Sequence, residues 1–247
     1  MPIFNKSNPL NGHGLAASNY GFSAIRIEDL GAAEYTLVTL VADVSPSTRG
    51  FRKAMEACLG EVLQACGASP RRHNLLVRLV AFASDLSEIH GFRPLADCRA
   101  EQYRGVLKSL RGTTALFDAT TNAVEATSAY GGKLLAGGYD VNGIVIVLTD
   151  GMDNDSTGTM AECKRVFDEA LSTEKLESLV TILVGVNAKD CAAYLQDFSR
   201  SVGFTQFVDV GDADAASLTR LAAFMSRSIS SQSVSLGTGG PSRLLTF

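Results

Sequence analysis

Apolar runs separated by stretches of helical periodicity are the feature that most constrains the fold of this chain. Residues 36–44 (TLVTLVADV), 75–83, 144–149 and 179–186 are almost continuously hydrophobic. A strand with one solvated face alternates apolar and polar residues, whereas a strand buried on both faces gives a continuous run. Because strands that alternate with helices form parallel sheets through right-handed crossovers, the pattern predicts an α/β fold.

The predicted architecture is a doubly wound, mostly parallel, six-stranded sheet with helices on both faces. The strands are expected at residues 36–44, 75–83, 88–93, 143–149, 179–186 and 204–210, with 88–93 as a short edge strand. Helices are expected at residues 51–66, 101–110, 116–130, 159–171, 190–202 and 214–229, where apolar residues recur every three or four positions. The glycine-rich residues 131–140 are expected to form an exposed connection.

The chain divides into three segments. Residues 1–34 form an N-terminal extension in which 20–29 could add a strand or hairpin, residues 35–229 form the α/β domain, and residues 230–247 form a Ser/Gly-rich tail. The tail finishes with Leu244, Leu245 and Phe247. Two interpretations stay open for it: a disordered end, or a linker with an apolar tip that docks on a sheet edge or groove and mediates self-association or partner binding.

Oxygen-bearing side chains follow two of the apolar runs. Asp43, Ser45 and Ser47 (Asp-x-Ser-x-Ser) stand at the end of the first run, and Asp150 comes directly after the central strand. A third group lies in the loop 112–119, which runs into a helix. Ligands of open parallel sheets bind outside the carboxyl ends of strands, and hard divalent cations prefer oxygen ligands. The pattern therefore predicts a metal site at this edge of the sheet.

These three elements together resemble the von Willebrand factor A (VWA) domain over roughly residues 35–229. Its metal-ion-dependent adhesion site (MIDAS) combines Asp-x-Ser-x-Ser, a threonine in a Gly-Gly-Thr-x-Leu-like loop and an aspartate in Thr-Asp-Gly. The resemblance implies that the metal site consists of Asp43, Ser45, Ser47, Thr114 and Asp150. Thr114 is preferred to Thr113 because Thr114 begins the Thr-x-Leu match. Pro46 and Thr113 stand where the family often has glycine, which leaves the geometry of both loops open.

The resemblance implies a stand-alone bacterial or phage-type interaction module, an adaptor rather than an enzyme. Three neutral hydroxyls and two carboxylates, one of them acting through water, would leave Mg²⁺ incompletely coordinated. An Asp or Glu of a protein partner would then complete the shell, with Mn²⁺ or Ca²⁺ as alternatives to Mg²⁺. Domains of this kind often accompany ATPases, kinases or phosphatases in stress and defence systems.

The same residues are also compatible with two other functions. A Mg²⁺-dependent phosphoryl-transfer enzyme could form an aspartyl phosphate at Asp43, but Ser45 stands where such enzymes usually carry a second aspartate. A structural subunit with a vestigial metal site is the third alternative. Asp153 and Asp155 are interpreted as an acidic solvated loop rather than an auxiliary cation site, and Asp118 as a buttress of the threonine loop. His13, His73 and His90 are expected at the surface or in loops.

Composition excludes several further classes of function. The net charge of −4, without any basic run, gives no support to nucleic-acid binding through phosphate contacts. No stretch approaches the ~20 apolar residues that cross a bilayer, and the N-terminus has no apolar signal core. The five scattered cysteines favour buried free thiols over disulfides. A cytoplasmic protein without membrane contact is therefore expected.

Overall fold

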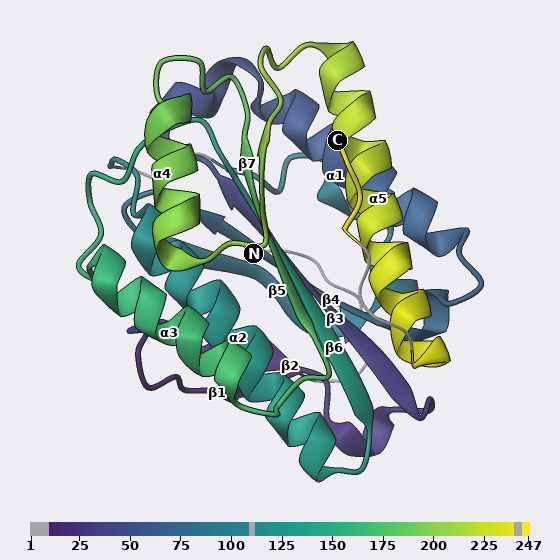
Figure 1. Ribbon diagram of the computed structural model, residues 1–247. Coiled ribbons are helices and arrows are strands. Elements are labelled where there is room, and N and C mark those ends of the chain that lie inside the picture. Colours follow the sequence, from purple (N-terminus) through teal and green to yellow (C-terminus); the bar gives the residue numbers. More distant parts are fainter. Residues whose placement is uncertain (1–9, 109–111, 240–243) are drawn as a thin grey trace.

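A single eight-stranded sheet organises the computed structural model, which describes residues 10–108, 112–239 and 244–247 (Figure 1). The strand order is β1-β2-β5-β4-β3-β6-β7-β8. The strands are β1 (Asn11–His13), β2 (Phe22–Ala24), β3 (Glu34–Asp43), β4 (Leu75–Phe82), β5 (Leu86–Pro94), β6 (Asp140–Thr149), β7 (Leu179–Gly185) and β8 (Gln206–Asp209). All pairs are parallel except β1 with β2 and β4 with β5.

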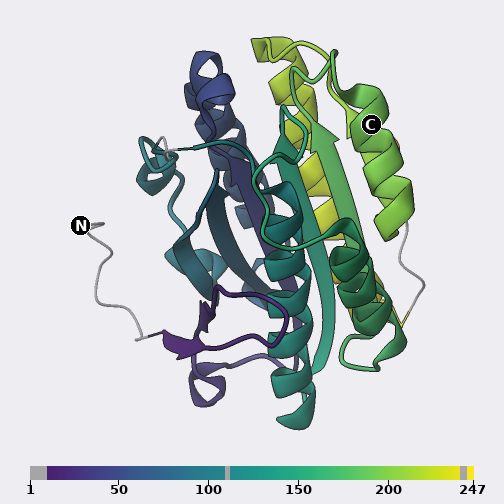
Figure 2. The same ribbon diagram turned by 90° about the vertical axis from the view of Figure 1, so that its left-hand side faces the viewer.

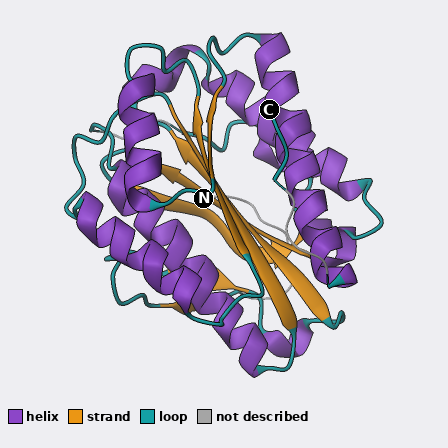
Figure 3. Cartoon of the chain, in the orientation of Figure 1, coloured by secondary structure: helices purple, strands orange, loops and turns teal. Residues whose placement is uncertain are grey.

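Two layers of helices cover the faces of this sheet (Figure 3). One layer holds α1 (Arg52–Gly67) and α5 (Ala215–Thr238), and the other holds α2 (Leu116–Ala136), α3 (Met160–Ser172) and α4 (Ala192–Val202). Strands β3, β4, β6 and β7 are buried on both faces, so each core layer receives alternate side chains of the same strands. The predicted doubly wound, mostly parallel architecture is confirmed, and its six strands are present.

The sheet is wider than predicted because β1 and β2 extend it beyond β5 (Figure 2). Polar contacts attach this N-terminal hairpin. The Ser23 backbone N–H and hydroxyl donate to the Glu88 carboxylate at 3.0 and 2.6 Å. Glu88 is also the ion-pair partner of Arg78, at 2.7 Å, and the Arg78 side chain is only 1% exposed. A buried guanidinium needs such a partner, so Arg78 ties the extension to the centre of the sheet.

The predicted helix at residues 101–110 is wrong. A short 3₁₀ helix, η5 (Ala100–Tyr103), is followed by an irregular segment in which Gly105 has φ of +73°. The backbone N–H groups of Gly105 and Leu107 both donate to the Glu56 carboxylate of α1, at 2.9 Å. These donors are satisfied by a distant side chain instead of by helical carbonyls. Residues 109 and 110 of the predicted helix lie outside the described residues.

Two helices run past their predicted ends. Helix α2 continues to Ala136 through Gly131, where a Cβ atom would lie 2.3 Å from the Leu176 side chain. Helix α5 continues to Thr238 rather than ending at Ile229. In this last part the polar residues face the sheet. The Gln232 carbonyl accepts from the Asn142 amide at 2.6 Å, and its own amide donates to the Ser178 hydroxyl at 2.7 Å. Because these groups are paired, a polar sequence stays helical and buried.

The apolar tip of the tail contacts its own chain. The Leu245 carbonyl accepts a hydrogen bond from the Gln206 side chain in β8 at 3.1 Å. Leu245 packs against the core, and the Phe247 ring lies edge-on to Phe224 of α5 with centroids 5.7 Å apart. Residues 240–243, which link this tip to α5, lie outside the described residues.

His90 is buried in β5, contrary to the surface position expected from the sequence. Its side chain is 4% exposed, its Nδ1 lies 2.9 Å from the Gly91 carbonyl, and its Nε2 contacts the Tyr103 hydroxyl. Burial, assisted by the charge of Arg93, lowers the pKa of His90 to about 3. The imidazole therefore stays neutral in the folded protein at all physiological pH values.

This burial predicts a loss of stability in mild acid. Between pH 6.5 and 3 the unfolded chain binds a proton at residue 90 that the folded chain excludes. The contribution of His90 to the free energy of unfolding should therefore be fully present above about pH 6.5 and fall by about 1.4 kcal/mol per pH unit below it. Asp150, whose pKa is raised to about 6, contributes in the opposite direction below that pH, so the His90 contribution is read from the difference between variants. Urea unfolding at pH 7.5 and pH 5 measures this effect. Relative to the wild type, His90→Gln should lose less stability, or gain more, between pH 7.5 and pH 5, whereas His73→Gln, at an exposed position, should follow the wild type.

Candidate metal centre

The five predicted site residues lie at the carboxyl ends of two neighbouring strands and in the loop before α2. Parallel pairing of β3 with β6 places Ala42 opposite Leu148, so the next residues, Asp43 and Thr149, adjoin at the rim of the sheet. The Thr149 hydroxyl donates to Asp43 Oδ2 at 2.7 Å. The strand order reverses here, because the chain builds β4 on one side of β3 and β6 on the other. Such a switch point is where open α/β sheets bind ligands.

Hydrogen bonds connect Asp43, Ser45, Ser47 and Asp150 one after the other. Asp43 Oδ1 accepts from the Ser45 N–H at 2.8 Å, and the Ser45 and Ser47 hydroxyls lie 3.0 Å apart. The Ser47 hydroxyl then donates to Asp150 Oδ1 at 2.9 Å. Pro46 begins the short helix η2 (Pro46–Gly50), a position that suits its fixed φ. The β3 loop and the β6 loop are therefore in direct contact.

Thr114 is held beside the same loop. Its backbone N–H donates to the Asn154 side-chain oxygen at 2.7 Å, and its carbonyl accepts from the Asn154 N–H at 3.0 Å. A Cβ atom added to Gly151 would lie 3.8 Å from the Thr114 hydroxyl oxygen. The Thr114 hydroxyl therefore adjoins the residue after Asp150. The neighbouring Thr113 is engaged elsewhere, because its N–H donates to the Ser84 hydroxyl at 2.8 Å.

The side chain of Arg52, at the start of α1, holds the serine loop in place. Its guanidinium donates to the carbonyls of Val44 and Ser45, each at 2.9 Å. Arg52, Thr149 and Asn154 all support the site, and none of them was predicted from the sequence. Thr149 could have been found from its place before Asp150, whereas Arg52 and Asn154 act on backbone groups and leave no motif.

The other acidic residues of this rim serve as acceptors for turns. Asp118 accepts from the N–H groups of Thr157 and Gly158, each at 2.9 Å, and Asp153 accepts from the Phe117 N–H at 3.1 Å. These bonds place Asp118 as a buttress of the loop that follows β6. Among the described residues, no three His, Cys, Asp or Glu side chains form a group that could hold a metal ion. The candidate site instead combines two carboxylates with three hydroxyls.

The electrostatics of the site favour a cation. Asp43 is fully buried, and burial raises the pKa of its carboxyl. Burial, followed by repulsion from Asp43, raises the pKa of Asp150 to about 6. A hard divalent ion is the species that oxygen donors of this kind bind and that would offset the repulsion between the two carboxylates. The donor set therefore fits the metal that the sequence motif implies.

The Thr149 hydroxyl should be required for stability. Thr149→Val removes a hydrogen bond to a buried carboxylate and leaves one of its oxygens unpaired, so the free energy of unfolding should fall by about 1–3 kcal/mol. Thr36→Val is the matched control in the same pair of strands. The Thr36 hydroxyl is fully buried and has no hydrogen-bond partner among the described residues, so its loss should be neutral or stabilising. Chemical unfolding of both variants decides whether the Asp43 contact matters.

Comparison with known proteins identifies the fold. No protein-family model and no curated protein matches the sequence. A mutant of the PilB minor pilin from Streptococcus sanguinis is similar with a TM-score of 0.60 and 12% identity, over 88% of this chain and 66% of the pilin. BatB, a conserved hypothetical protein from Bacteroides thetaiotaomicron, has a TM-score of 0.50 and 14% identity, over 78% of this chain and 98% of BatB.

A third neighbour carries a metal site of the expected type. Proximal thread matrix protein 1 from the mussel byssus, solved with zinc in its MIDAS motif, has a TM-score of 0.53 and 19% identity, over 80% of this chain and 46% of that protein. This chain spans less than two thirds of the length of the pilin and of the thread protein. At these identities the likeness defines the fold alone, and that fold is the Rossmann-like α/β fold of VWA domains.

Proposed function

We propose that this protein is a metal-dependent interaction module, an adaptor that binds an acidic residue of a partner protein through a divalent cation. Asp43, Ser45, Ser47, Thr114 and Asp150 would hold the ion, with Mg²⁺ as the first candidate and Mn²⁺ or Ca²⁺ as alternatives. The observation that carries the proposal is the continuous chain of hydrogen bonds from Asp43 through both serines to Asp150. It gathers oxygen donors from two separate loops at one point of the sheet rim.

The site has a closed floor and an open side. Asp43 and Ser45 are buried, Asp150 is half-buried and Ser47 is exposed, so a partner would approach past Ser47 and Asp150. The bound ion would supply attraction for an anionic oxygen, because three of the five donors are neutral hydroxyls. Met152 is 49% exposed just beyond Asp150 and offers an apolar contact to the same partner. The proposed specificity is therefore for an acidic residue that has an apolar neighbour.

The burial of Asp43 supports a binding role over phosphoryl transfer. A nucleophilic carboxylate must present an oxygen to the phosphorus atom. Both Asp43 oxygens accept hydrogen bonds, one from Ser45 and one from Thr149, and the side chain is fully buried. This arrangement suits a residue that orients ligands or bound water.

We also propose that the protein works in a reducing compartment such as the cytoplasm. All five cysteines are buried free thiols, which is the usual state in a reducing compartment such as the cytoplasm. No helix in the described ranges is both long and apolar enough to cross a membrane.

Thr114→Ala and Thr113→Ala form a matched pair that tests the metal site. Loss of a ligand should weaken Mg²⁺ binding by about tenfold or more in Thr114→Ala, whereas Thr113→Ala should stay close to wild type. Isothermal titration with Mg²⁺ measures the affinity, and the rise in Tm with added Mg²⁺ provides a second readout. Equal affinities in the two variants would contradict the assignment of Thr114.

Partner binding requires a separate experiment. The wild-type protein should capture a partner from its native lysate in Mg²⁺ and release it in EDTA. Asp43→Ala and Thr114→Ala should each lose that partner while their circular dichroism spectra stay close to wild type. Capture that persists in EDTA and in both variants would favour a structural subunit with a vestigial site.

A further inference from the structure

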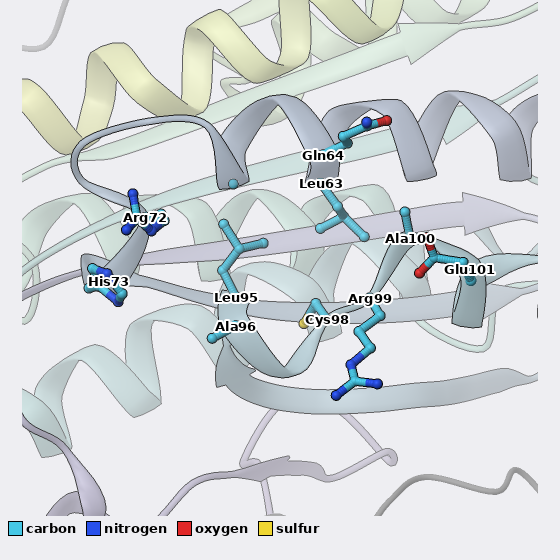
Figure 4. A pocket seen from close by; sticks show the side chains of 11 residues that line it. Leu63, Gln64, Arg72, His73, Leu95, Ala96, Cys98, Arg99, Ala100 and Glu101 are labelled. Atoms are coloured by element: carbon cyan, nitrogen blue, oxygen red, sulfur yellow. The ribbon is translucent and has the colours of Figure 1, made fainter.

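A cleft with a volume of about 420 Å³ lies at the far end of α1 from the candidate metal centre (Figure 4). One wall is the last part of α1, and the other is the chain from η4 (Leu95–Asp97) to η5. The short helix η3 (Arg72–Asn74) closes one end. Leu63 in this cleft lies about 17 Å along the helix axis from Arg52, at the rise of an α-helix. A volume of this size is typical of small-molecule sites.

The floor of the cleft is apolar. Leu63 and Leu95 line it from opposite walls and are each 4% exposed, and Cys98 lies beside them at 8%. Burial raises the pKa of the Cys98 thiol to about 11, so this group is a neutral and unreactive part of the lining at physiological pH. The floor therefore suits the apolar body of a ligand and does not supply a nucleophile.

Two arginines and a histidine lie at one end and along one wall of the cleft. Arg72 and His73 project side by side at the η3 end, and Arg99 projects from the η4–η5 wall (Figure 4). All three are exposed, and neither arginine forms an ion pair within the described residues. By contrast, the adjacent Arg71 pairs with Glu34 at 2.6 Å. The acidic group of the cleft, Glu101, lies at the end opposite to Arg72.

We propose that this cleft binds a small organophosphate, with its phosphate at the Arg72–His73 end and its apolar body over Leu63 and Leu95. The Arg72 guanidinium matches the geometry of phosphate oxygens and forms no ion pair within the described residues, whereas Arg99 lies nearer the Glu101 end (Figure 4). The volume accommodates a body of about the size of a mononucleotide. The site shares no residue with the candidate metal centre, so it goes beyond the proposed interaction function and does not depend on it.

Titration of the full chain with 1-naphthyl phosphate, followed by ¹⁵N NMR, tests the proposal. Saturable shifts are expected at residues 63–67, 72–73 and 95–101. Inorganic phosphate lacks the apolar body and 1-naphthol lacks the charge, so each should bind at least tenfold more weakly. The Arg72→Gln/Arg99→Gln double variant should lose at least tenfold in affinity for 1-naphthyl phosphate. Arg104→Gln changes an exposed arginine outside the cleft and should bind as the wild type does.

Three results would overturn the proposal. The first is the absence of saturable shifts with 1-naphthyl phosphate at these residues. The second is binding of inorganic phosphate or 1-naphthol as tight as that of 1-naphthyl phosphate. Equal binding of inorganic phosphate would mean that the apolar floor makes no contribution, and equal binding of 1-naphthol would mean the same of the arginines. The third is unchanged affinity in the double variant. Binding that persists in Thr114→Ala supports a site independent of the metal centre, whereas loss in that variant would contradict it.

Discussion

Parallel pairing between β3 and β6 is the constraint on which the rest of this structure depends. The two strands are registered from Glu34 opposite Asp140 to Ala42 opposite Leu148, and both are buried along almost their whole length. A shift of one residue would turn every side chain to the other face and would mismatch both core layers. The same register brings Asp43 beside Thr149 and so to within one residue of Asp150. The hydrophobic core therefore positions the polar residues of the rim.

Placing a carboxylate at a fully buried position has a cost that the surrounding residues must offset. Asp43 loses its hydration, and the N–H of Ser45 and the hydroxyl of Thr149 replace part of it. Arg52 holds the carbonyls of the serine loop, which keeps that loop in the conformation that presents its N–H. Burial, and after it repulsion from Asp43, raises the pKa of Asp150, so the protein groups around the site do not fully compensate its charge. A site of this kind gains from a bound cation more than a surface cluster does.

The parts of the fold that could be predicted are those in which local pattern and burial agree. Strands β3, β4, β6 and β7 were predicted correctly because both of their faces are buried. The rule that ligands bind at the carboxyl ends of parallel strands placed Asp43 and Asp150 together. The failures have long-range causes. The Glu56 carboxylate captures the N–H groups of Gly105 and Leu107, Gln232 is paired with residues of the sheet, and His90 is buried under Tyr103. The spacing of residues along the chain does not reveal partners that are distant in sequence. The contacts of Arg52 and Asn154 with the site were not predicted for the same reason.

The two edge strands of the sheet affect how this protein can associate with other chains. On one side the edge strand is β1, which has only three residues. On the other side β8 has only four residues, and Leu245 contacts Gln206 there. Exposed strands are templates for aggregation and fibre growth, which short or covered edges prevent. The sheet is thus poorly suited to polymerise by the addition of strands at its edges.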